Sequence, residues 1–483
     1  MRRALLFAFL VACGSGSAEA TDPDGANGAT DPSGSSAGPG TSPSPGKTDP
    51  SPGTSDAGAD GATTSSRARC GATPYQWSTS ATLGDVLESN SAAGHTPLEM
   101  TYAVIEAKNK GAMKTNRLPK HSTKSKVLRY VTQDRGKLLD ATTLIAYPDV
   151  SSAKTFPILL VLHGTAGFTD ACAPSKGVAD DALGGFSDGT GLLLSIFASL
   201  GYVAVAPDYI GLKSLGSPTG FMHPYLVAEP TAIASLDAVR AAKKQLAGSN
   251  ITTGDVVVMG GSQGGHAAAF VNRYAPHYAP ELTIKGSVWD VPPTDLAGQA
   301  KPALATTTNA TKNMIAATAA LESWYGASPN GLSAAFLAPF DVDIPKALTS
   351  GCSPGDALKG ATRETIFTPA YLSPSGLPTP FDCYLTENSL PTTSVPKVDT
   401  IPSMFLVGEK DELVDNVVER ASFQKLCSQG LVLQYLECAG ASHTKPLTYA
   451  FDQWLDFLED RLANKALTGT CVVKPAETCT STP

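Results

Sequence analysis

The chain has 483 residues, a formal net charge of −8, a hydrophobic fraction of 42% and a charged fraction of 17%. This composition is typical of a soluble globular enzyme with a sizeable core, and it excludes a fibrous protein. No basic patch suited to neutralising phosphates occurs, so no nucleic-acid partner is expected.

The amino terminus has the features of an export signal. Arg2 and Arg3 form a positive segment, and Leu5 to Ala12 form an apolar segment that is too short to span a bilayer. Leu10 to Cys13 resembles the lipobox of bacterial lipoproteins, in which the cysteine is diacylated and becomes the first mature residue. We therefore expect a membrane-anchored lipoprotein, on the outer membrane or the cell surface. The alternative is an ordinary signal cleaved near Ser17 to Ala20, which would give a secreted protein.

The next segment predicts a tether. Residues 14–66 contain no aromatic residue and no Leu, Ile, Val or Met. Such a segment cannot bury enough apolar area to offset the entropy of ordering, so we expect it to be disordered.

Eight cysteines follow Cys13, an even number that predicts disulfides in an exported protein. Proximity in the sequence favours four pairs, namely Cys70 with Cys172, Cys352 with Cys383, Cys427 with Cys438, and Cys471 with Cys479. The close Cys and His spacing of a structural metal site is missing from the sequence, so no metal is expected.

From about residue 126 onward, short aliphatic runs alternate with helical patterns, which predicts a mostly parallel sheet covered on both faces. The eight predicted strands are Lys126 to Thr132, Ala141 to Ala146, Ile158 to Leu162, Tyr202 to Ala206, Val256 to Met259, Ile284 to Trp289, Ser403 to Val407 and Val432 to Glu437. The predicted helices are Leu192 to Leu200, Ala232 to Leu246, Gly265 to Tyr274, Val417 to Cys427 and Leu447 to Arg461.

Residues 291–400 separate two of these strands and are rich in Ala, Thr, Pro and Gly. A structureless loop of this length is improbable in a compact domain, so the segment is expected to fold as an inserted, mainly helical cap. Its larger apolar side chains could line an acyl pocket or form the cap's own core. They include Trp324, Tyr325, Phe336, Leu337 and Phe340.

A buried strand runs directly into Gly260-Gly261-Ser262-Gln263-Gly264 and then into a helix. This is the context of a nucleophile elbow, in which glycines relieve the crowding of a tight strand-to-helix turn. The turn would present Ser262 as a nucleophile at the amino end of the helix. The backbone N–H of Gln263 would then donate to an oxyanion.

A serine nucleophile needs a general base and a carboxylate that orients it, and in this fold the acid and then the base follow the serine in the chain. Asp411 stands in the turn after the strand that ends at Val407, so it is the predicted acid. Glu409, Glu412 and Asp415 are close competitors that we expect to be solvated surface carboxylates.

His443 is the predicted base. It follows the last strand, and it is the only histidine downstream of the nucleophile helix. His266 and His277 lie on or just after that helix, where packing or surface roles are expected.

A second oxyanion donor should come from the loop after the third strand. Ile158 to Leu162 leads into His163-Gly164-Thr165-Ala166-Gly167. The backbone N–H of Thr165 is the predicted donor, with Ala166 as the alternative. His163 is expected to be structural.

These motifs together resemble the secretory lipase family of the α/β-hydrolase superfamily, over roughly residues 125–465. The resemblance implies an α/β-hydrolase fold with a helical lid, hydrolysis of acylglycerols or simpler carboxylic esters, and a structural role for the Asp208-Tyr209 pair. Ester hydrolysis by a serine triad needs no cofactor, so none is expected. The blocks that carry the resemblance are His163 to Thr165, Asp170 to Ser175, Ala206 to Gly211, His223 to Tyr225, Ser235 to Ala242 and Gly261 to His266.

The predicted protein is therefore an exported, monomeric lipase or carboxylesterase that works through an acyl-enzyme. Two other readings stay open, a peptidase of the prolyl-oligopeptidase type and an inactive surface-binding protein. The expected layout is a signal peptide (1–12), a tether (13–66), the first part of the hydrolase core (67–290), the cap (291–400), the second part of the core (401–465) and a cysteine-containing tail (466–483).

Overall fold

The structure is a computed structural model that describes residues 69–479, apart from residues 110, 112, 177–188, 354, 356–357, 359 and 399–400. The predicted signal peptide, Cys13 and the tether lie outside the described residues. Within the described part, no helix is both long enough and apolar enough to cross a membrane.

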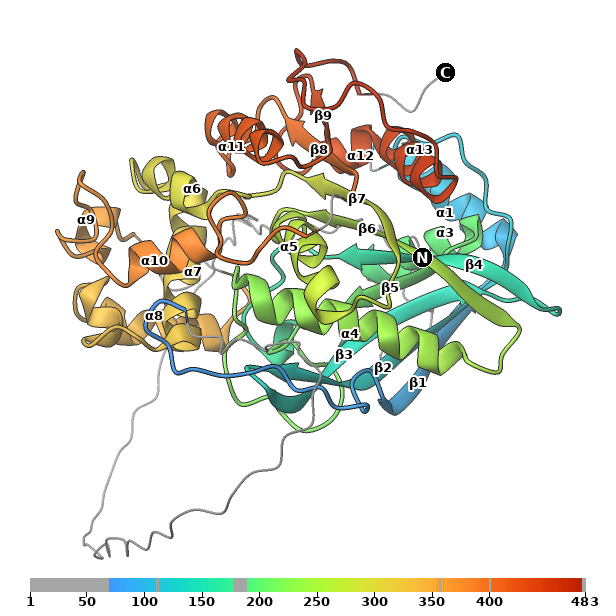
Figure 1. Ribbon diagram of the computed structural model, residues 1–483, viewed down its shortest axis with the longest axis horizontal. Coiled ribbons are helices and arrows are strands. Elements are labelled where there is room, and N and C mark those ends of the chain that lie inside the picture. Colours follow the sequence, from blue (N-terminus) through green and yellow to red (C-terminus); the bar gives the residue numbers. More distant parts are fainter. Residues whose placement is uncertain are drawn as a thin grey trace, which may run out of the picture. The chain divides into compact units, whose positions relative to one another are not determined.

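Nine strands of the described chain form one sheet in the order β1-β2-β3-β5-β4-β6-β7-β8-β9 (Figure 1). The pairs β1–β2, β2–β3 and β3–β5 are antiparallel, and all the other pairs are parallel. The strands are β1 (Val86–His95), β2 (Thr123–Asp134), β3 (Lys137–Pro148), β4 (Lys154–Leu162), β5 (Val203–Pro207), β6 (Ile251–Gly261), β7 (Ile284–Asp290), β8 (Ser403–Gly408) and β9 (Leu433–Cys438).

The mostly parallel sheet is confirmed, but the predicted number of eight strands is wrong. The additional strand is β1, which pairs only with β2 at the edge of the sheet. Its sequence is VLESNSAAGH, and only His95 is buried in it. An edge strand with this little burial does not need alternating apolar residues, so it leaves no hydrophobic period to detect in the sequence.

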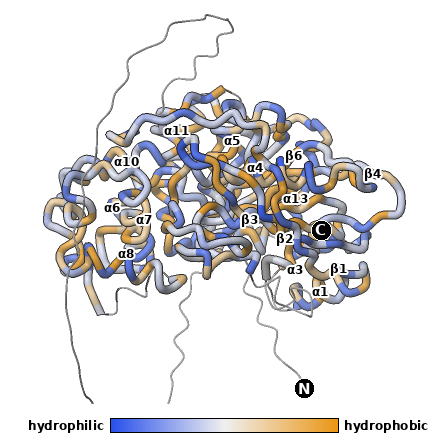
Figure 2. The backbone as a smooth tube through the Cα atoms, turned by 90° about the horizontal axis from the view of Figure 1, so that it is seen from below, coloured by the Kyte–Doolittle hydropathy of each residue, from blue (hydrophilic) through white to orange (hydrophobic). Residues whose placement is uncertain are grey.

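Helices cover both faces of the sheet, and the apolar segments in Figure 2 concentrate around the strands between them. On one face the helices are α4 (Ala228–Leu246), α5 (Gln263–Tyr278) and α11 (Asn416–Ser428). On the other they are α1 (Pro97–Asn109), α3 (Gly189–Leu200) and α13 (Phe451–Leu462). The helix expected over Leu447 to Arg461 is broken at Ala450, which separates α12 (Pro446–Tyr449) from α13.

The connection from β7 to β8 is mainly helical and builds an apolar cluster of its own. Trp324, Tyr325 and Phe336 are buried in this cluster. The elements are α6 (Leu296–Ala303), α7 (Asn309–Tyr325), η2 (Gly331–Ala334), α8 (Phe340–Ser350), α9 (Arg363–Ile366) and α10 (Phe381–Glu387). A further short 3₁₀ helix, η1 (Asp170–Cys172), follows β4.

All eight cysteines after Cys13 form disulfides, as predicted, but every predicted pairing is wrong. The observed pairs are Cys70–Cys383, Cys172–Cys352, Cys427–Cys471 and Cys438–Cys479.

The direction of the tail explains two of these errors. The Cys471 N–H donates to the carbonyl of Leu433 at the start of β9, whereas Glu477 pairs in parallel with Cys438 at its end. The tail therefore runs alongside β9, with Cys471 and Cys479 near opposite ends of the strand. Closeness in the sequence thus corresponds to separation in space.

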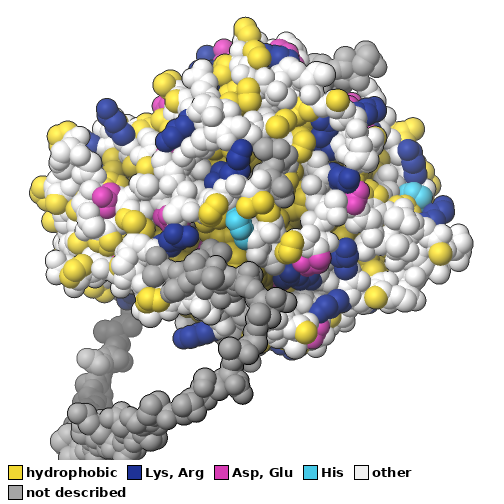
Figure 3. All heavy atoms as spheres, in the orientation of Figure 1, with side chains coloured by type: hydrophobic (Ala, Val, Ile, Leu, Met, Phe, Trp, Pro, Cys, Tyr) yellow, Lys and Arg dark blue, Asp and Glu magenta, His cyan; other side chains and the backbone are white. Residues whose placement is uncertain are grey.

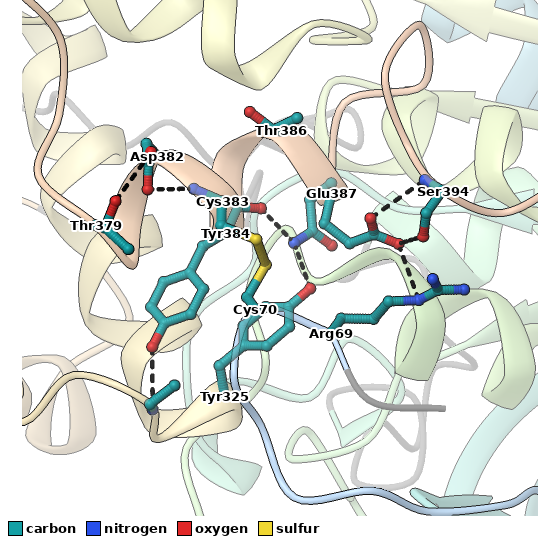
Figure 4. The surroundings of a disulfide bond; sticks show 12 residues. Arg69, Cys70, Tyr325, Thr379, Asp382, Cys383, Tyr384, Thr386, Glu387 and Ser394 are labelled. Carbon is teal, nitrogen blue, oxygen red and sulfur yellow. Dashed lines mark hydrogen bonds and ion pairs between the residues drawn. A yellow bond between two sulfur atoms is a disulfide. The ribbon is translucent and has the colours of Figure 1, made fainter. Parts of the chain in front are cut away.

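Figure 4 shows how the Cys70–Cys383 bridge joins the first described residues to α10. Beside the bridge, Arg69 forms an ion pair with Glu387 over 3.3 Å. The amino-terminal segment of the described chain is therefore fixed to the cap, although the two are more than 300 residues apart in the sequence.

Candidate active site

Ser262 occupies the turn between β6 and α5 with φ of 56° and ψ of −119°. A Cβ atom at Gly260 would lie 2.1 Å from the carbonyl oxygen of Gly264, and one at Gly264 would lie 1.9 Å from that of Leu162. Only glycine fits at these two positions. The backbone conformation of Ser262, with its positive φ, costs a non-glycine residue on the order of 1–3 kcal/mol. Strain of this kind is concentrated at functional sites.

The structure brings the three predicted catalytic residues into one chain of hydrogen bonds. The Oγ atom of Ser262 lies 2.9 Å from Nε2 of His443. Nδ1 of His443 lies 2.9 Å from each carboxylate oxygen of Asp411. Ser262 is 8% exposed and His443 is fully buried, so water does not compete freely for these bonds. The arrangement can activate a serine hydroxyl for attack.

Backbone groups and a neighbouring carboxylate hold the acid and the base in place. One oxygen of Asp411 accepts hydrogen bonds from the N–H groups of Leu413 and Val414, both over 2.9 Å. Glu412 is exposed, as expected, but it also accepts from the backbone N–H of His443 over 3.1 Å. Sequence reasoning missed this positioning contact because it depends on the meeting of two loops.

The other two carboxylates of this turn also have structural partners. Glu409 accepts from the N–H of Gly440 over 2.7 Å. Asp415 is the N-cap of α11 and accepts from the N–H groups of Val417 and Val418. Neither side chain contacts His443, which leaves Asp411 as its carboxylate partner.

The two predicted oxyanion donors flank the nucleophile turn. Thr165 follows β4 and Gln263 begins α5, and the strand ends are adjacent because Leu162 pairs with Gly260. In the described part of the chain, neither backbone N–H donates to another group. Both are therefore available to a substrate oxygen.

His223 holds the side chain of Gln263. Nδ1 of His223 donates to the carbonyl of Ile210 over 2.8 Å, so its Nε2 can accept from Nε2 of Gln263 over 2.7 Å. Burial lowers the pKa of His223 to about 3, which keeps the ring neutral near pH 7. The sequence contained His223 within a family motif, but it gave no indication of this contact.

His163 stabilises the loop that follows β4, residues His163 to Gly167, which carries Thr165 and is called the oxyanion loop below. Its Nδ1 lies 2.6 Å from the carbonyl of Gly164, and its ring stacks on Tyr209 with centroids 4.1 Å apart. The Tyr209 hydroxyl donates back to the carbonyl of His163. Burial lowers the pKa of His163 to about 4. Asp208 accepts from the N–H of Ser175, so this group of residues packs and hydrogen-bonds as expected of a structural unit.

The two histidines of the nucleophile helix have other partners. Nε2 of His266 lies 2.8 Å from the carbonyl of Asn388, and burial lowers its pKa to about 4. His277 is half-buried and its Nε2 contacts the carbonyl of Pro396. Neither residue approaches the hydrogen-bond chain of Ser262.

A second buried carboxyl group lies beside this site. Asp290 ends β7 and is 1% exposed. Its Oδ1 atom has no hydrogen-bond partner in the described part of the chain. Burial, together with the charge of Asp411, raises the pKa of Asp290 well above its usual value. The neutral acid is therefore favoured at Asp290.

A cavity of about 60 Å³ opens on Ser262 and His443 beneath the first helices of the cap. Apart from Ser262 and His443 its wall is mainly apolar, with the amides of Gln263, Gln299 and Asn313 among the polar exceptions. Helix α7 contributes Ala310, Met314 and Ala317, which share one face. Trp324, Tyr325 and Phe336 do not line the cavity. Of the two roles considered for them, the structure supports the cap's own core.

No group of three or more His, Cys, Asp or Glu side chains in the described residues is arranged to hold a metal ion. On the face shown in Figure 3, Lys and Arg side chains are scattered among apolar and uncharged ones.

Comparison with known proteins gives a family and two similar folds. Residues 189–319 match the secretory lipase family. The structure resembles the rice cell wall degrading esterase LipA from Xanthomonas oryzae, with 19% identity, a TM-score of 0.62, and coverage of 79% of this chain and 97% of that one. It also resembles Candida antarctica lipase A in its closed state, with 17% identity, a TM-score of 0.64, and coverage of 84% and 90%. A search of curated proteins found no match.

These findings confirm the α/β-hydrolase fold and the resemblance predicted from the sequence. The four disulfides are typical of an exported protein, as the family description also indicates. The chain is a carboxylic ester hydrolase whose residues 189–319 match the secretory lipases.

Proposed function

We propose that the protein is a serine esterase that prefers carboxylic esters with short acyl groups. Ser262 is the nucleophile, His443 is the general base and Asp411 is the acid. The observation that supports this most strongly is the unbroken hydrogen-bond chain from Asp411 through His443 to Ser262, at the floor of an apolar cavity.

In the acylation step, Oγ of Ser262 attacks the ester carbonyl carbon while Nε2 of His443 takes the hydroxyl proton. Asp411 stabilises the imidazolium that forms. The carbonyl oxygen becomes an oxyanion and accepts hydrogen bonds from the N–H groups of Thr165 and Gln263. Collapse of this intermediate breaks the bond to the leaving alcohol, which receives the proton from His443.

The acyl group is then esterified to Ser262 and is released by water. His443 takes a proton from the water as it attacks the acyl carbon. The second tetrahedral intermediate collapses, the carboxylic acid leaves, and Ser262 recovers its proton from His443. No step requires a cofactor.

The preference for short acyl groups follows from the size of the cavity. Pockets that hold drug-sized ligands usually measure about 300–1,000 Å³. The cavity above Ser262 measures about 60 Å³ and is lined by residues of α6 and α7. A short acyl chain needs little rearrangement there, whereas a long one requires the cap helices to move apart.

The test is hydrolysis of p-nitrophenyl esters of increasing acyl length by the full chain and by Ser262→Ala. We expect activity that falls from acetate and butyrate towards palmitate. The Ser262→Ala variant should lose on the order of 10⁶-fold in kcat, because the members of such a triad act as a unit. The matched control is Ser235→Ala, which removes another buried hydroxyl, one that donates to the carbonyl of Thr231.

Labelling with a fluorophosphonate separates this proposal from its alternatives. Covalent labelling of the wild type and of Ser235→Ala, but not of Ser262→Ala, supports the nucleophile. Efficient cleavage of p-nitroanilides would indicate a peptidase. Absence of both labelling and turnover would indicate an inactive binding protein, and labelling that persists in Ser262→Ala would disprove the assignment.

The membrane anchor is a separate proposal that rests on the sequence around Cys13. In a bacterial host, the wild type should incorporate labelled fatty acid and partition with membranes. A Cys13→Ala variant should do neither. Equal membrane partitioning of the two proteins would disprove lipidation at Cys13.

A further inference from the structure

A second cavity lies under the carboxyl-terminal tail. It measures about 360 Å³ and is bounded by β9, by α13 and by tail residues between Ala466 and Glu477. The disulfides Cys427–Cys471 and Cys438–Cys479 attach the tail wall covalently to the core. The cavity is much larger than the one above Ser262, and its size falls within the range of small-molecule sites.

The central feature of this cavity is the side chain of Arg461, which is 5% exposed. A Cβ atom at Gly286 would lie 2.4 Å from Cγ of Arg461, so the glycine makes room for the arginine stem. The guanidinium carbon lies 5.2 Å from the centre of the Phe457 ring, and Phe457 also lines the cavity. The arginine is thus held by packing, and it forms part of the cavity wall.

Arg461 lacks a counterion in the part of the chain that the structure describes. Its Nε atom is buried and makes no hydrogen bond, and no described carboxylate forms an ion pair with the side chain. A largely buried cation without an ion-pair partner is costly, because it has lost much of its hydration and has only the Phe457 ring beside it in return. The site is therefore electrostatically incomplete without an anion.

Three acidic residues of the cavity wall already form ion pairs with cations outside it, although the cation of Asp456 is shared with Asp452 and Glu459. These ion pairs are Glu437 with Arg420, Asp456 with Arg117, and Asp460 with Lys465. The acids of the wall therefore do not supply the charge that Arg461 lacks.

The remaining polar groups of the wall define what else a ligand would offer. Lys474, on the tail, adds a second cation. Oε1 of Gln453 is buried without a hydrogen-bond donor in the described chain. Glu477 is exposed, and it accepts from Nε2 of Gln453 only over 3.5 Å. The wall thus presents cations for an oxyanion and oxygen acceptors for a hydroxyl or ammonium group.

We propose that this cavity binds a small organic anion. Its carboxylate or phosphate group pairs with Arg461 and Lys474, and a hydroxyl or ammonium group of the same molecule donates to Gln453. Planar guanidinium groups suit both kinds of oxyanion because they donate two parallel hydrogen bonds. This proposal does not depend on the esterase mechanism, because the cavity shares no lining residue with the one above Ser262.

The test uses the full chain, with malate as the carboxylate probe and glycerol 3-phosphate as the phosphate probe. Binding is measured by titration calorimetry and by the shift in Tm. We expect at least one probe to bind the wild type, with a Kd at least tenfold weaker in Arg461→Met. The matched control is Lys425→Met, which removes an exposed cation of α11 that does not line the cavity.

Two further measurements keep the test decisive. Without a probe, Arg461→Met should melt no lower than the wild type, because it removes an unpaired buried charge. If that variant fails to fold, Lys474→Met, at an exposed position, should weaken probe binding while the turnover of p-nitrophenyl acetate stays unchanged.

Binding of malate alone identifies a carboxylate ligand, and binding of glycerol 3-phosphate alone identifies a phosphate ligand. Failure of both probes to bind the wild type at millimolar concentration would overturn the proposal. Equal affinity of the wild type and Arg461→Met, or of the wild type and Lys474→Met, would overturn it as well.

Discussion

Two carboxyl groups buried beside the proposed nucleophile differ in their hydrogen bonds. Asp411 accepts hydrogen bonds from His443 and from two backbone N–H groups. Asp290 has one oxygen without a partner in the described chain, and burial raises its pKa well above the usual value. Of the two, only Asp411 hydrogen-bonds to the histidine in the described chain.

This difference predicts opposite responses to the same substitution. Asp411→Asn should lower kcat about 10⁴-fold, because an amide does not orient the imidazole or stabilise its charged form. Asp290→Asn should keep activity close to that of the wild type, because a neutral group replaces a neutral group. Turnover of p-nitrophenyl acetate measures both. Equal losses in the two variants would contradict these assignments.

Glu419 makes stability depend on pH. It is fully buried and accepts from Thr294 and Gln299, yet burial raises its pKa from 4.5 to about 7. The folded state therefore holds a proton that the unfolded state releases. Its contribution to stability is fully present below pH 4.5 and is lost as the pH rises through 7.

We expect Glu419→Gln to remove this dependence. Between pH 4 and pH 8, the wild type should lose roughly 3 kcal/mol of unfolding free energy that the variant retains, because one pKa unit corresponds to about 1.4 kcal/mol. Urea unfolding at several pH values provides the measurement. The control is Glu364→Gln, at an exposed glutamate of the cap. Parallel pH profiles for the wild type and Glu419→Gln would refute the prediction.

At the scale of elements, the position of a strand or helix is predicted best from the sequence where one or both of its faces are buried. The run Val256 to Met259 is fully buried, and the turn after it allows only glycine at two positions, so both leave strong signals in the sequence. The order of Ser262, Asp411 and His443 along the strand ends has the same origin. The edge strand β1 buries little and leaves no such signal.

The sequence predicted that the eight cysteines after Cys13 form disulfides, but it did not predict which cysteines pair. In a parallel sheet all strands start at the same edge. Two residues at the start and the end of one strand are therefore close in the sequence but a strand length apart in space. Cys438 and Cys427 are separated in this way by β9. The contact of Gln263 with His223 was hidden for a related reason, since it joins the nucleophile helix to a loop 40 residues earlier.

Helix α7 should determine which acyl groups fit. Met314 lies between Ala310 and Ala317 on the face that lines the cavity above Ser262. Met314→Ala should enlarge the cavity and shift the preference towards longer acyl chains, by about tenfold in the ratio of kcat/KM for octanoate over acetate. Profiles of p-nitrophenyl ester hydrolysis measure this ratio.

The matched control for this variant is Leu321→Ala on the same helix. Leu321 is buried in the cap cluster and does not line the cavity. The control should lower Tm, because it leaves a cavity in the cap core, without changing the ratio. A ratio that changes equally in both variants would show that general loosening of the cap, and not the position of Met314, sets the preference.

At the scale of the whole molecule, the disulfides form two sets. Cys70–Cys383 and Cys172–Cys352 attach the cap to the segments before and after the first strands. The other two attach the tail to the edge of the sheet at β9. Within the first set, the Cys172–Cys352 bridge lies against the loop after β4, since a Cβ atom at Gly167 would lie 2.4 Å from Cβ of Cys172.

Removing one bridge from each set should therefore have different effects. Cys172→Ser with Cys352→Ser should lower both stability and kcat/KM, because the oxyanion loop loses its attachment to the cap. Cys427→Ser with Cys471→Ser should lower stability alone. Each loss is expected to be about 2–5 kcal/mol in urea unfolding. Unchanged kcat/KM in the first variant would contradict a link between the bridge and the loop.

The bridge pattern also has a consequence for how the protein matures after export. In three of the four bridges, at least one other cysteine of the described chain lies between the two partners in the sequence. Cys70 and its partner Cys383 are 313 residues apart. An oxidant that joins thiols in their order of emergence would first link Cys70 to Cys172, which is a wrong pair. Correct bridges then require exchange through a mixed disulfide. We expect the yield of active enzyme to depend on a disulfide isomerase in the compartment that receives the chain.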